Sequence, residues 1–154
     1  MSVLAPEQRL LDAGLELPPA PAVLGAYVPA VRSGNLVFTA GQLPMRDGAL
    51  LAQGTVGADV TEEEAVGCAR QCALNALAAA STVCDLSSVS SVVKLVGYVA
   101  SAPGFTAQPA VLNGASDVVR VAFGEAGAHA REAVGVAALP LGAPVELSLV
   151  LEVG

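Results

Sequence analysis

The sequence predicts an α+β fold in which a single sheet carries two main helices packed on one of its faces. Thr61 and Glu64 have the spacing of a helix capping box and open a segment with apolar residues at steps of three and four. The run from Val89 to Ala100 is rich in β-branched residues. From Val145 to Val153, apolar residues recur at every second position, the period of a strand with one buried face. These patterns favour helices and strands that alternate along one chain.

Prolines, glycines and asparagine divide the first sixty residues into short elements. Proline in the first turn and glycine at the end favour a short helix near the N-terminus. The elements expected here are a helix over Ala5–Gly14, an irregular extended segment over Leu17–Pro29, a hairpin of Val28–Arg32 and Leu36–Gly41 about a three-residue turn at Ser33-Gly34-Asn35, and a loop over Leu43–Asp59 with a turn at Arg46-Asp47-Gly48.

Two longer helices are expected in the rest of the chain. The first begins after the N-cap Thr61 and ends near Cys84, with an inward stripe of mostly small residues that allows close approach to a sheet. The second spans Pro109 to Gly124. Both are expected to lie over the apolar face of the strand at Val145–Val153.

Three strands are expected to complete the sheet. Val89–Ala100 is apolar at nearly every position and is predicted to be a central strand. Ala133–Leu139 is the next strand, and Pro140 stops it. Val145–Val153 is the last. The expected order of elements is therefore helix, strand, strand, helix, strand, helix, strand, strand.

Length and composition limit the classes of protein to consider. The 154 residues fit one domain, 1–154, and 54% of them are hydrophobic whereas only 14% are charged. A typical soluble domain is about 25% charged, so a homo-oligomer that covers apolar surface is expected. The formal net charge of −7 and an aromatic content of 3% argue against a nucleic-acid binder, which should show a basic face and more aromatic residues.

No membrane span or metal centre is expected. The longest uncharged stretch, Leu95 to Ser116, contains two prolines and several polar residues, and the N-terminus lacks the apolar region of a signal peptide, so a cytoplasmic location is predicted. Cys68, Cys72 and Cys84 fit reduced thiols, and no second pair completes a four-ligand site. The single histidine, His129, is predicted to be a surface or loop residue.

An arginine and a glutamate stand out because the chain has so few charges. Arg131 precedes the expected strand Ala133–Leu139, and Glu146 lies near the start of the next strand. The residues alone leave two interpretations open. The pair can form an ion pair at a sheet edge, or Arg131 can bind an anion, since its planar paired donors match a carboxylate.

The run from Ala130 to Leu147 resembles the signature of the RidA/YjgF reactive-intermediate deaminase family. The resemblance extends upstream to Gly25-Ala26-Tyr27 and to Ser33–Pro44, which are similar to the first hairpin of that family. It covers residues 18–153 and leaves 1–17 as an N-terminal extension. Extra residues at the N-terminus, at Ser101–Phe105 and at Gly124–Ala130 resemble a longer subgroup.

The resemblance implies a fold, an assembly and a reaction. The fold is the chorismate-mutase-like α+β fold, in a homotrimer whose sheets face inward as a central barrel and whose ligand clefts lie between subunits. The reaction is the hydrolysis of 2-imino acids, or enamines such as 2-aminoacrylate, to 2-keto acids and ammonia without a cofactor or metal. The partner is a small-molecule carboxylate.

The resemblance also implies roles for individual residues. Arg131 would hold the substrate carboxylate, and Glu146 would orient or activate the attacking water. The implied substrate-binding positions are Tyr27 from a neighbouring subunit, the backbone at Ala40 and Gly41, the helix residue Asn113, and Ala133.

The chain departs from the family pattern at three positions: Glu132 follows the arginine in place of a small residue, Ala133 replaces a frequent cysteine, and Ala40 replaces a common serine. If the strand has begun by Arg131, alternation turns Glu132 to the other face; otherwise its charge competes with an anionic substrate. The alternatives are a non-catalytic trimeric binder or sensor of small carboxylates, a translation inhibitor or endoribonuclease, and other hydrolase or lyase chemistry.

Overall fold

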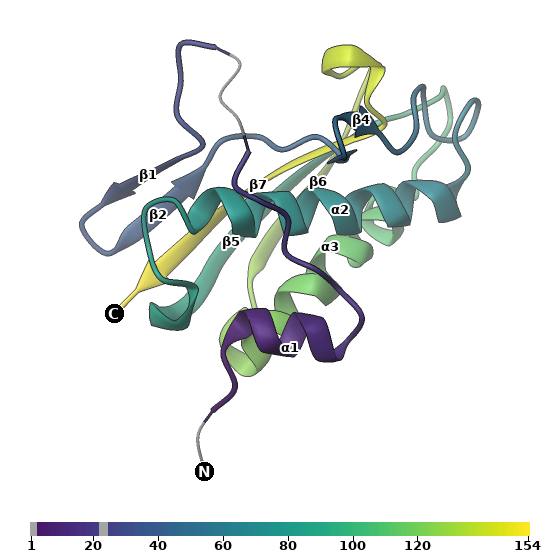
Figure 1. Ribbon diagram of the computed structural model, residues 1–154. Coiled ribbons are helices and arrows are strands. Elements are labelled where there is room, and N and C mark those ends of the chain that lie inside the picture. The colour runs from purple at the N-terminus through teal and green to yellow at the C-terminus, as the bar shows by residue number, and fades with distance from the viewer. Residues whose placement is uncertain (1–2, 22–24) are drawn as a thin grey trace.

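The chain forms one five-stranded sheet with helices on one face, as seen in a computed structural model that describes residues 3–21 and 25–154 (Figure 1). The strand order is β1-β2-β7-β5-β6, and every pairing is antiparallel except that of β5 with β6. The α+β class and the order of the main elements are confirmed. The strands are β1 (Ala30–Ser33), β2 (Leu36–Thr39), β5 (Val89–Ala100), β6 (Ala130–Val136) and β7 (Val145–Val153).

Two long helices cover one face of this sheet. They are α2 (Glu62–Ala80) and α3 (Gln108–Phe123), and the short helix α1 (Pro6–Asp12) packs against α3. The predicted capping box opens α2: Thr61 Oγ1 accepts from the Glu64 amide at 3.1 Å, and the Thr61 amide donates to the Glu64 carboxylate at 2.9 Å. The alternating apolar residues of β7 are all buried beneath the helices, as expected.

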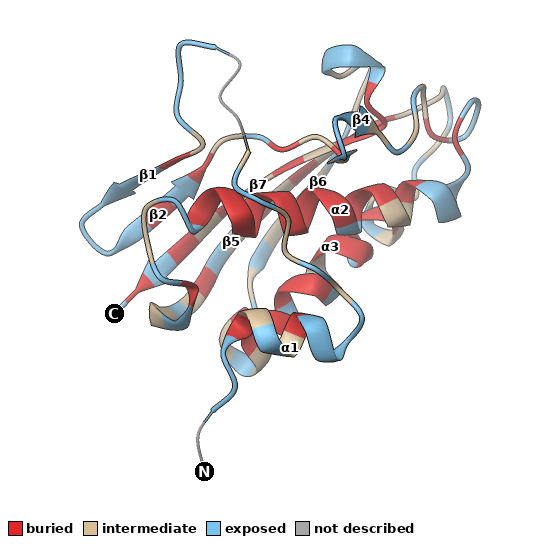
Figure 2. Cartoon of the chain, viewed as in Figure 1, coloured by how far each residue is buried: buried red, intermediate tan, exposed pale blue. Residues whose placement is uncertain are grey.

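The second half of α2 is buried on every side. All residues from Gln71 to Ala80 are buried, although most are small (Figure 2). The sheet and α3 cover two sides, and the chain after α1 crosses the outer side (Figure 1). Leu15 and Leu17 of this crossing segment pack against the core. The extended segment predicted for Leu17–Pro29 contains no helix or strand where it is described, and 22–24 lie outside the described residues.

The early loops differ in detail from the prediction. Ser33 pairs with Leu36, so the β1–β2 turn has two central residues and not three, and Gly34 supplies the positive φ that the turn needs. The predicted loop Leu43–Asp59 contains a second, two-stranded sheet, β3 (Met45–Arg46) and β4 (Ala49–Leu50). Its turn is Asp47-Gly48, and both residues have positive φ, which is the hairpin geometry that Asp-Gly favours.

The strand predicted at Ala133–Leu139 is shifted. β6 begins at Ala130 and ends at Val136, because it pairs in parallel with β5 from Lys94 to Ala100 and β5 ends there. Arg131 therefore lies inside a strand. The remaining connections contain three short helical turns: η1 (Leu86–Ser88), η2 (Gly124–Gly127) and η3 (Pro140–Gly142).

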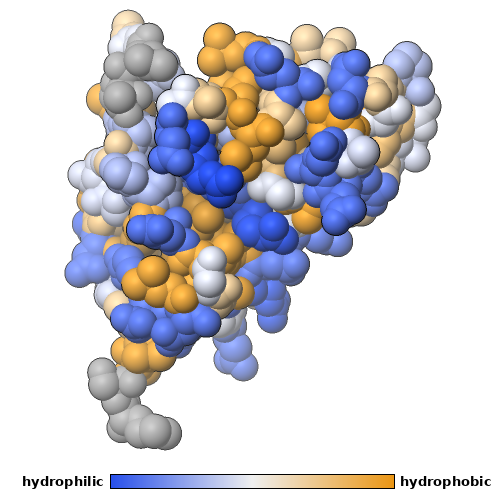
Figure 3. Space-filling model, turned by 45° about the vertical axis from the view of Figure 1, so that its right-hand side comes forward, coloured by the Kyte–Doolittle hydropathy of each residue, from blue (hydrophilic) through white to orange (hydrophobic). Residues whose placement is uncertain are grey.

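The face of the sheet opposite the helices is open. Val31, Phe38 and Val134 point to this face and are 52%, 43% and 40% exposed. β5, predicted to be central, does lie between β7 and β6, but only one of its faces is buried within the chain. Apolar patches also lie among the polar groups on the side seen in Figure 3. In the described part of the chain, no helix combines the length and apolarity needed to cross a membrane.

Candidate functional site

Arg131 points toward the helices from the edge strand β6. Its register partner on β5 is Leu95, which is buried beneath the helices. The guanidinium lies against α3: Nη1 donates to Asn113 Oδ1 at 2.8 Å and to Ser116 Oγ at 3.1 Å, and Nη2 donates to the Pro109 carbonyl at 3.3 Å. Three of its five N–H groups are thus used within the described chain. Nε–H and one N–H of Nη2 remain to bind an anion.

Two neighbours of Arg131 were not recognised as site residues in the sequence. Ser116 is one turn beyond Asn113 on α3, and its Oγ lies 2.9 Å from His129 Nε2. His129 directly precedes β6 and is half-buried, so its assignment as an ordinary surface or loop residue overlooks its hydrogen bonds. The i, i+3 spacing of Asn113 and Ser116 is a signal that could have found the serine.

Glu132 lies on the opposite face from Arg131, because the strand has already begun. Its carboxylate pairs with Lys94 Nζ at 2.8 Å on the open face. Since the strand has begun by Arg131, the Glu132 carboxylate is turned away from the guanidinium and does not compete with an anion beside it. Ala133 is two residues beyond Arg131 and lies on the same face as the guanidinium.

Glu146 belongs to a different group of residues. It sits on β7, pairs with Tyr98 of β5, and points to the open face, where it lines a cavity of about 610 Å³. Tyr27, Ala40 and Gly41 line the same cavity. A side chain at Gly41 would collide with Glu146 Oε1, so glycine is what permits this close approach. The Gly41 amide has no hydrogen-bond partner within the described chain and remains available to a ligand.

Burial raises the pKa of the Glu146 carboxyl above its ordinary value of 4.5. Desolvation disfavours the charged form, and the described chain places no cation beside the carboxylate to offset it. A carboxylate with a raised pKa is a better proton acceptor than one in open water. Glu146 is therefore suited to act as a base toward a water molecule.

The predicted site residues thus form two groups on opposite faces of one sheet. Arg131, Asn113 and Ala133 lie at the helix-side edge, whereas Tyr27, Ala40, Gly41 and Glu146 border the open face. Within one chain, Arg131 and Glu146 do not form the ion pair that was one interpretation of the sequence, because the sheet separates them. Within residues 3–21 and 25–154, the one ion pair is that of Lys94 with Glu132.

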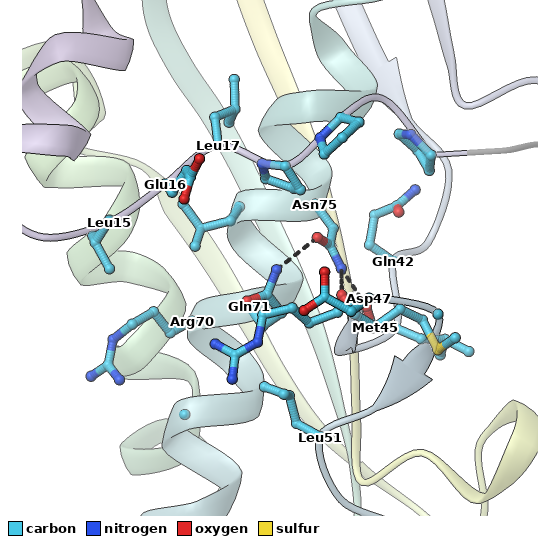
Figure 4. Close-up of a pocket in the computed structure, with 18 of the residues that line it drawn as sticks. Leu15, Glu16, Leu17, Gln42, Met45, Asp47, Leu51, Arg70, Gln71 and Asn75 are labelled. Atoms are coloured by element: carbon cyan, nitrogen blue, oxygen red, sulfur yellow. Dashed lines mark hydrogen bonds between the residues drawn. The ribbon is translucent and has the colours of Figure 1, made fainter.

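A larger cavity, of about 1000 Å³, lies between α2, the crossing segment and the β3–β4 hairpin (Figure 4). Asn75 organises its wall: Nδ2 donates to the carbonyls of Leu43 and Met45, both at 2.9 Å, and Oδ1 accepts from Gln71 at 3.0 Å. Tyr27 and Gly41 also line this cavity, but Arg131 and Glu146 do not. Size alone does not make this cavity the site, because neither the Arg131 guanidinium nor the Glu146 carboxyl lines it.

The cysteines are unsuited to nucleophilic chemistry. Cys68, Cys72 and Cys84 are free thiols. Burial raises the pKa of Cys68 to about 11 and that of Cys72 well above its ordinary value, and the reactive species is the thiolate. No group of three or more metal-ligating His, Cys, Asp or Glu side chains occurs in the described part of the chain.

Comparison with known proteins finds relatives along nearly the whole chain. Residues 7–153 match the family model described as "YjgF/chorismate_mutase-like, putative endoribonuclease". Protein TCP17 of Trypanosoma cruzi is 45% identical over 152 residues, which cover 97% of this chain and 93% of that protein.

Two solved structures are similar in fold and sequence. One, from Shewanella oneidensis and described as a "putative endoribonuclease", is 38% identical with a TM-score of 0.93, over 97% of this chain and 100% of that one. The other is TdcF of E. coli with bound serine, 25% identical with a TM-score of 0.61, over 88% of this chain and 94% of that one.

Proposed function

Because the chain belongs to the YjgF/chorismate mutase-like family, we propose that it hydrolyses 2-imino acids or their enamine tautomers to 2-keto acids and ammonia. The observation that carries the proposal is the guanidinium of Arg131, fixed against α3 by three hydrogen bonds with two N–H groups left over. Two adjacent N–H donors match the two oxygens of a carboxylate. The bound serine of TdcF is itself an α-substituted carboxylate, which supports a ligand of this class.

The proposed chemistry needs only water and a base. Glu146 accepts a proton from water as the oxygen bonds to C2 of the imine, and the C=N electron pair moves to nitrogen. The nitrogen takes this proton from Glu146 to give an amine, and a second proton then passes from the new hydroxyl to the nitrogen. The C2–N bond breaks, ammonia leaves, and C2 becomes a carbonyl. No electrons are transferred overall, so the proposal includes no redox cofactor. Imines hydrolyse readily in water, and a gain of about 10³-fold requires only about 4 kcal/mol off the barrier.

The site proposed for this reaction lies between two copies of the chain. One molecule cannot bring Arg131 and Glu146 to the same small ligand, because the sheet stands between them. Two copies can do so if the β6 edge of one meets the open-face cavity of the other, with Tyr27 from the second copy closing the cleft. A heterologous contact closes into a ring when each step rotates the chain by a whole fraction of a turn. A rotation of a third of a turn gives the homotrimer that we propose, with the open, apolar sheet faces inside as a barrel.

The first test measures the reaction. An amino-acid oxidase generates imino acids in situ, and their decay is followed with the wild type, Arg131→Ala and Glu146→Gln. We expect the wild type to accelerate the decay and release ammonia, and both variants to lose most of that acceleration. Equal decay rates with the wild type and Arg131→Ala would overturn the proposed reaction.

The second test asks whether two chains share a site. Arg131→Ala and Glu146→Gln are unfolded and refolded together in equal amounts. If three copies form a ring with one cleft at each contact, about a quarter of the clefts regain both groups, because each mixed ring contains one intact cleft. Each variant refolded alone is the control. Recovery of no activity in the mixture, with light scattering showing mixed assemblies, would contradict the shared cleft.

The alternatives predict different outcomes of the same experiments. A non-catalytic binder or sensor would bind a 2-keto acid through Arg131 without ammonia release. An endoribonuclease, as the family description suggests, would cleave RNA, and the net charge of −7 argues against it. RNA cleavage that persists in Arg131→Ala would favour that second activity. The cytoplasmic location and the longer subgroup stay predictions.

A further inference from the structure

A chain of hydrogen bonds runs from a buried turn to the guanidinium of Arg131. His129 Nδ1 lies 2.6 Å from the carbonyl oxygen of Gly127. Because a carbonyl oxygen only accepts, Nδ1 carries a hydrogen, and in a neutral imidazole Nε2 then presents its lone pair. Ser116 Oγ lies 2.9 Å from Nε2, so the serine donates its single hydroxyl hydrogen to the histidine.

The hydrogen bond to His129 fixes the orientation of the Ser116 hydroxyl beside Arg131. With its hydrogen directed to His129, Ser116 presents lone pairs to Arg131 Nη1 at 3.1 Å. Asn113 Oδ1 accepts the other Nη1 hydrogen at 2.8 Å. Both hydrogens of Nη1 are therefore engaged, and rotation of the guanidinium would break at least one of these bonds.

The far end of the chain of hydrogen bonds is anchored to α3. Gly127 is buried, and a Cβ there would lie 2.7 Å from the carbonyl oxygen of Val119 and 3.0 Å from the Cα of Arg120. The turn thus packs directly on the helix backbone, and its carbonyl has a fixed place. His129 bridges this fixed carbonyl to Ser116, one turn of the helix away from Val119.

We propose that His129, acting through Ser116, is a positioning residue that holds the Arg131 guanidinium in the orientation that receives a carboxylate. The inference rests on the proposed function for the identity of the acid. A neutral imidazole with hydrogen on Nδ1 is the form that sets the serine as an acceptor. Loss of His129 removes the acceptor that fixes the hydroxyl hydrogen, so the lone pairs of Ser116 are no longer held toward Arg131 Nη1.

The test compares a carboxylate with its neutral counterpart. Calorimetry measures binding of pyruvate and of pyruvamide, which differ only in the group that Arg131 would hold. The wild type is expected to prefer pyruvate. Ser116→Ala should weaken pyruvate binding about tenfold, the low end for a hydrogen bond to a charged group, and His129→Ala about fivefold. Neither variant should change pyruvamide binding, whereas a general loss of structure would weaken both ligands.

The double variant tests whether the histidine works through the serine. Since His129 acts only by orienting the Ser116 hydroxyl, Ser116→Ala combined with His129→Ala should bind pyruvate no more weakly than Ser116→Ala alone. His129→Gln should restore most of the affinity, because an amide can donate to Gly127 and accept from Ser116. Asp117→Ala, at the next and exposed position of α3, is the control and should bind as the wild type does.

Any of three results would overturn the proposal. The double variant could lose pyruvate affinity by the product of the two single-variant factors, the variants could lose as much affinity for pyruvamide as for pyruvate, or the wild type could show no preference for pyruvate. Ammonia release is measured separately. If the wild type releases no ammonia from imino acids but the binding pattern appears, the proposed reaction fails and the positioning role of His129 stands.

Discussion

Gly114→Ala sets the helix propensity of alanine against the close contact between α3 and α2. The change in the free energy of unfolding shows which effect is larger. Alanine is favoured over glycine inside a helix by about 1 kcal/mol. At Gly114, however, a Cβ would overlap the carbonyl oxygen of Val66 on α2 and lie 3.0 Å from Val66 Cγ1. The obstacle is backbone and cannot rotate away, so the helices must move apart. Overpacking of this kind costs about 1–3 kcal/mol. After the propensity gain is subtracted, we expect a net loss of up to about 2 kcal/mol.

Gly67→Ala is the matched control. Gly67 is also inside a long helix, α2, but a Cβ there meets nothing within 4 Å. This variant should gain about 0.5–1 kcal/mol from helix propensity alone. Urea denaturation at one fixed protein concentration gives both values as shifts in the midpoint at constant slope. If Gly114→Ala proves as stabilising as Gly67→Ala, the close contact between α2 and α3 is refuted.

The remaining predictions concern a titration, a helix cap and the thiols. Burial raises the pKa of Glu146 above 4.5, so the folded chain holds this proton more tightly than the unfolded chain and stability falls as pH rises past 4.5. Glu146→Gln should therefore be more stable than the wild type at neutral pH and equal to it at about pH 3.5; urea denaturation at both values that shows a constant difference would contradict this. Thr61→Ala removes Oγ1, the acceptor for the Glu64 amide, and leaves the backbone amide at position 61 that donates to the Glu64 carboxylate. It should cost about 1 kcal/mol by the same method, and an unchanged midpoint would count against the cap. With a pKa of about 11 for Cys68 and a still more buried Cys72, iodoacetamide should label both far more slowly in the folded chain than in urea, as mass spectrometry can measure.

The parts of the fold that sequence predicted well are those where one local pattern decides the structure. Thr61 begins α2 because the cap and its partner Glu64 are only three residues apart, and both hydrogen bonds form as expected. The alternation from Val145 to Val153 placed every second residue of β7 beneath the helices, since burial on one face requires that period.

β6 was misplaced because its limits depend on a partner strand. Its first residue is Ala130, opposite Lys94 of β5, and its last is Val136, opposite Ala100. The polar pair Arg131-Glu132 does not look like a strand in isolation, and the apolar residues after Val136 do. Hydrogen bonding to β5 overrides both local signals.

Strand register also determines the arrangement of the candidate site, which the sequence did not predict. Resemblance to the family named Arg131 and Glu146, but the faces on which they lie follow from the pairing of both strands with β5. The sequence predicts only a surface or loop residue at His129, since it shows no partner for a histidine outside the expected strand. Once β6 begins at Ala130, this residue stands beside Ser116 and its bonds are apparent.

The placement of Arg131 and Glu146 on opposite sides of one sheet has a consequence for how the protein fails. If the proposed reaction takes place in a cleft shared by two chains, a single chain carries both groups but has no complete site. Dilution below the dissociation constant of the assembly would then abolish activity without unfolding the chain. In a closed ring, chemical damage to one of the two side chains would disable a single cleft. Loss of a whole subunit would open both of the clefts it borders, and the two kinds of injury would leave different residual rates.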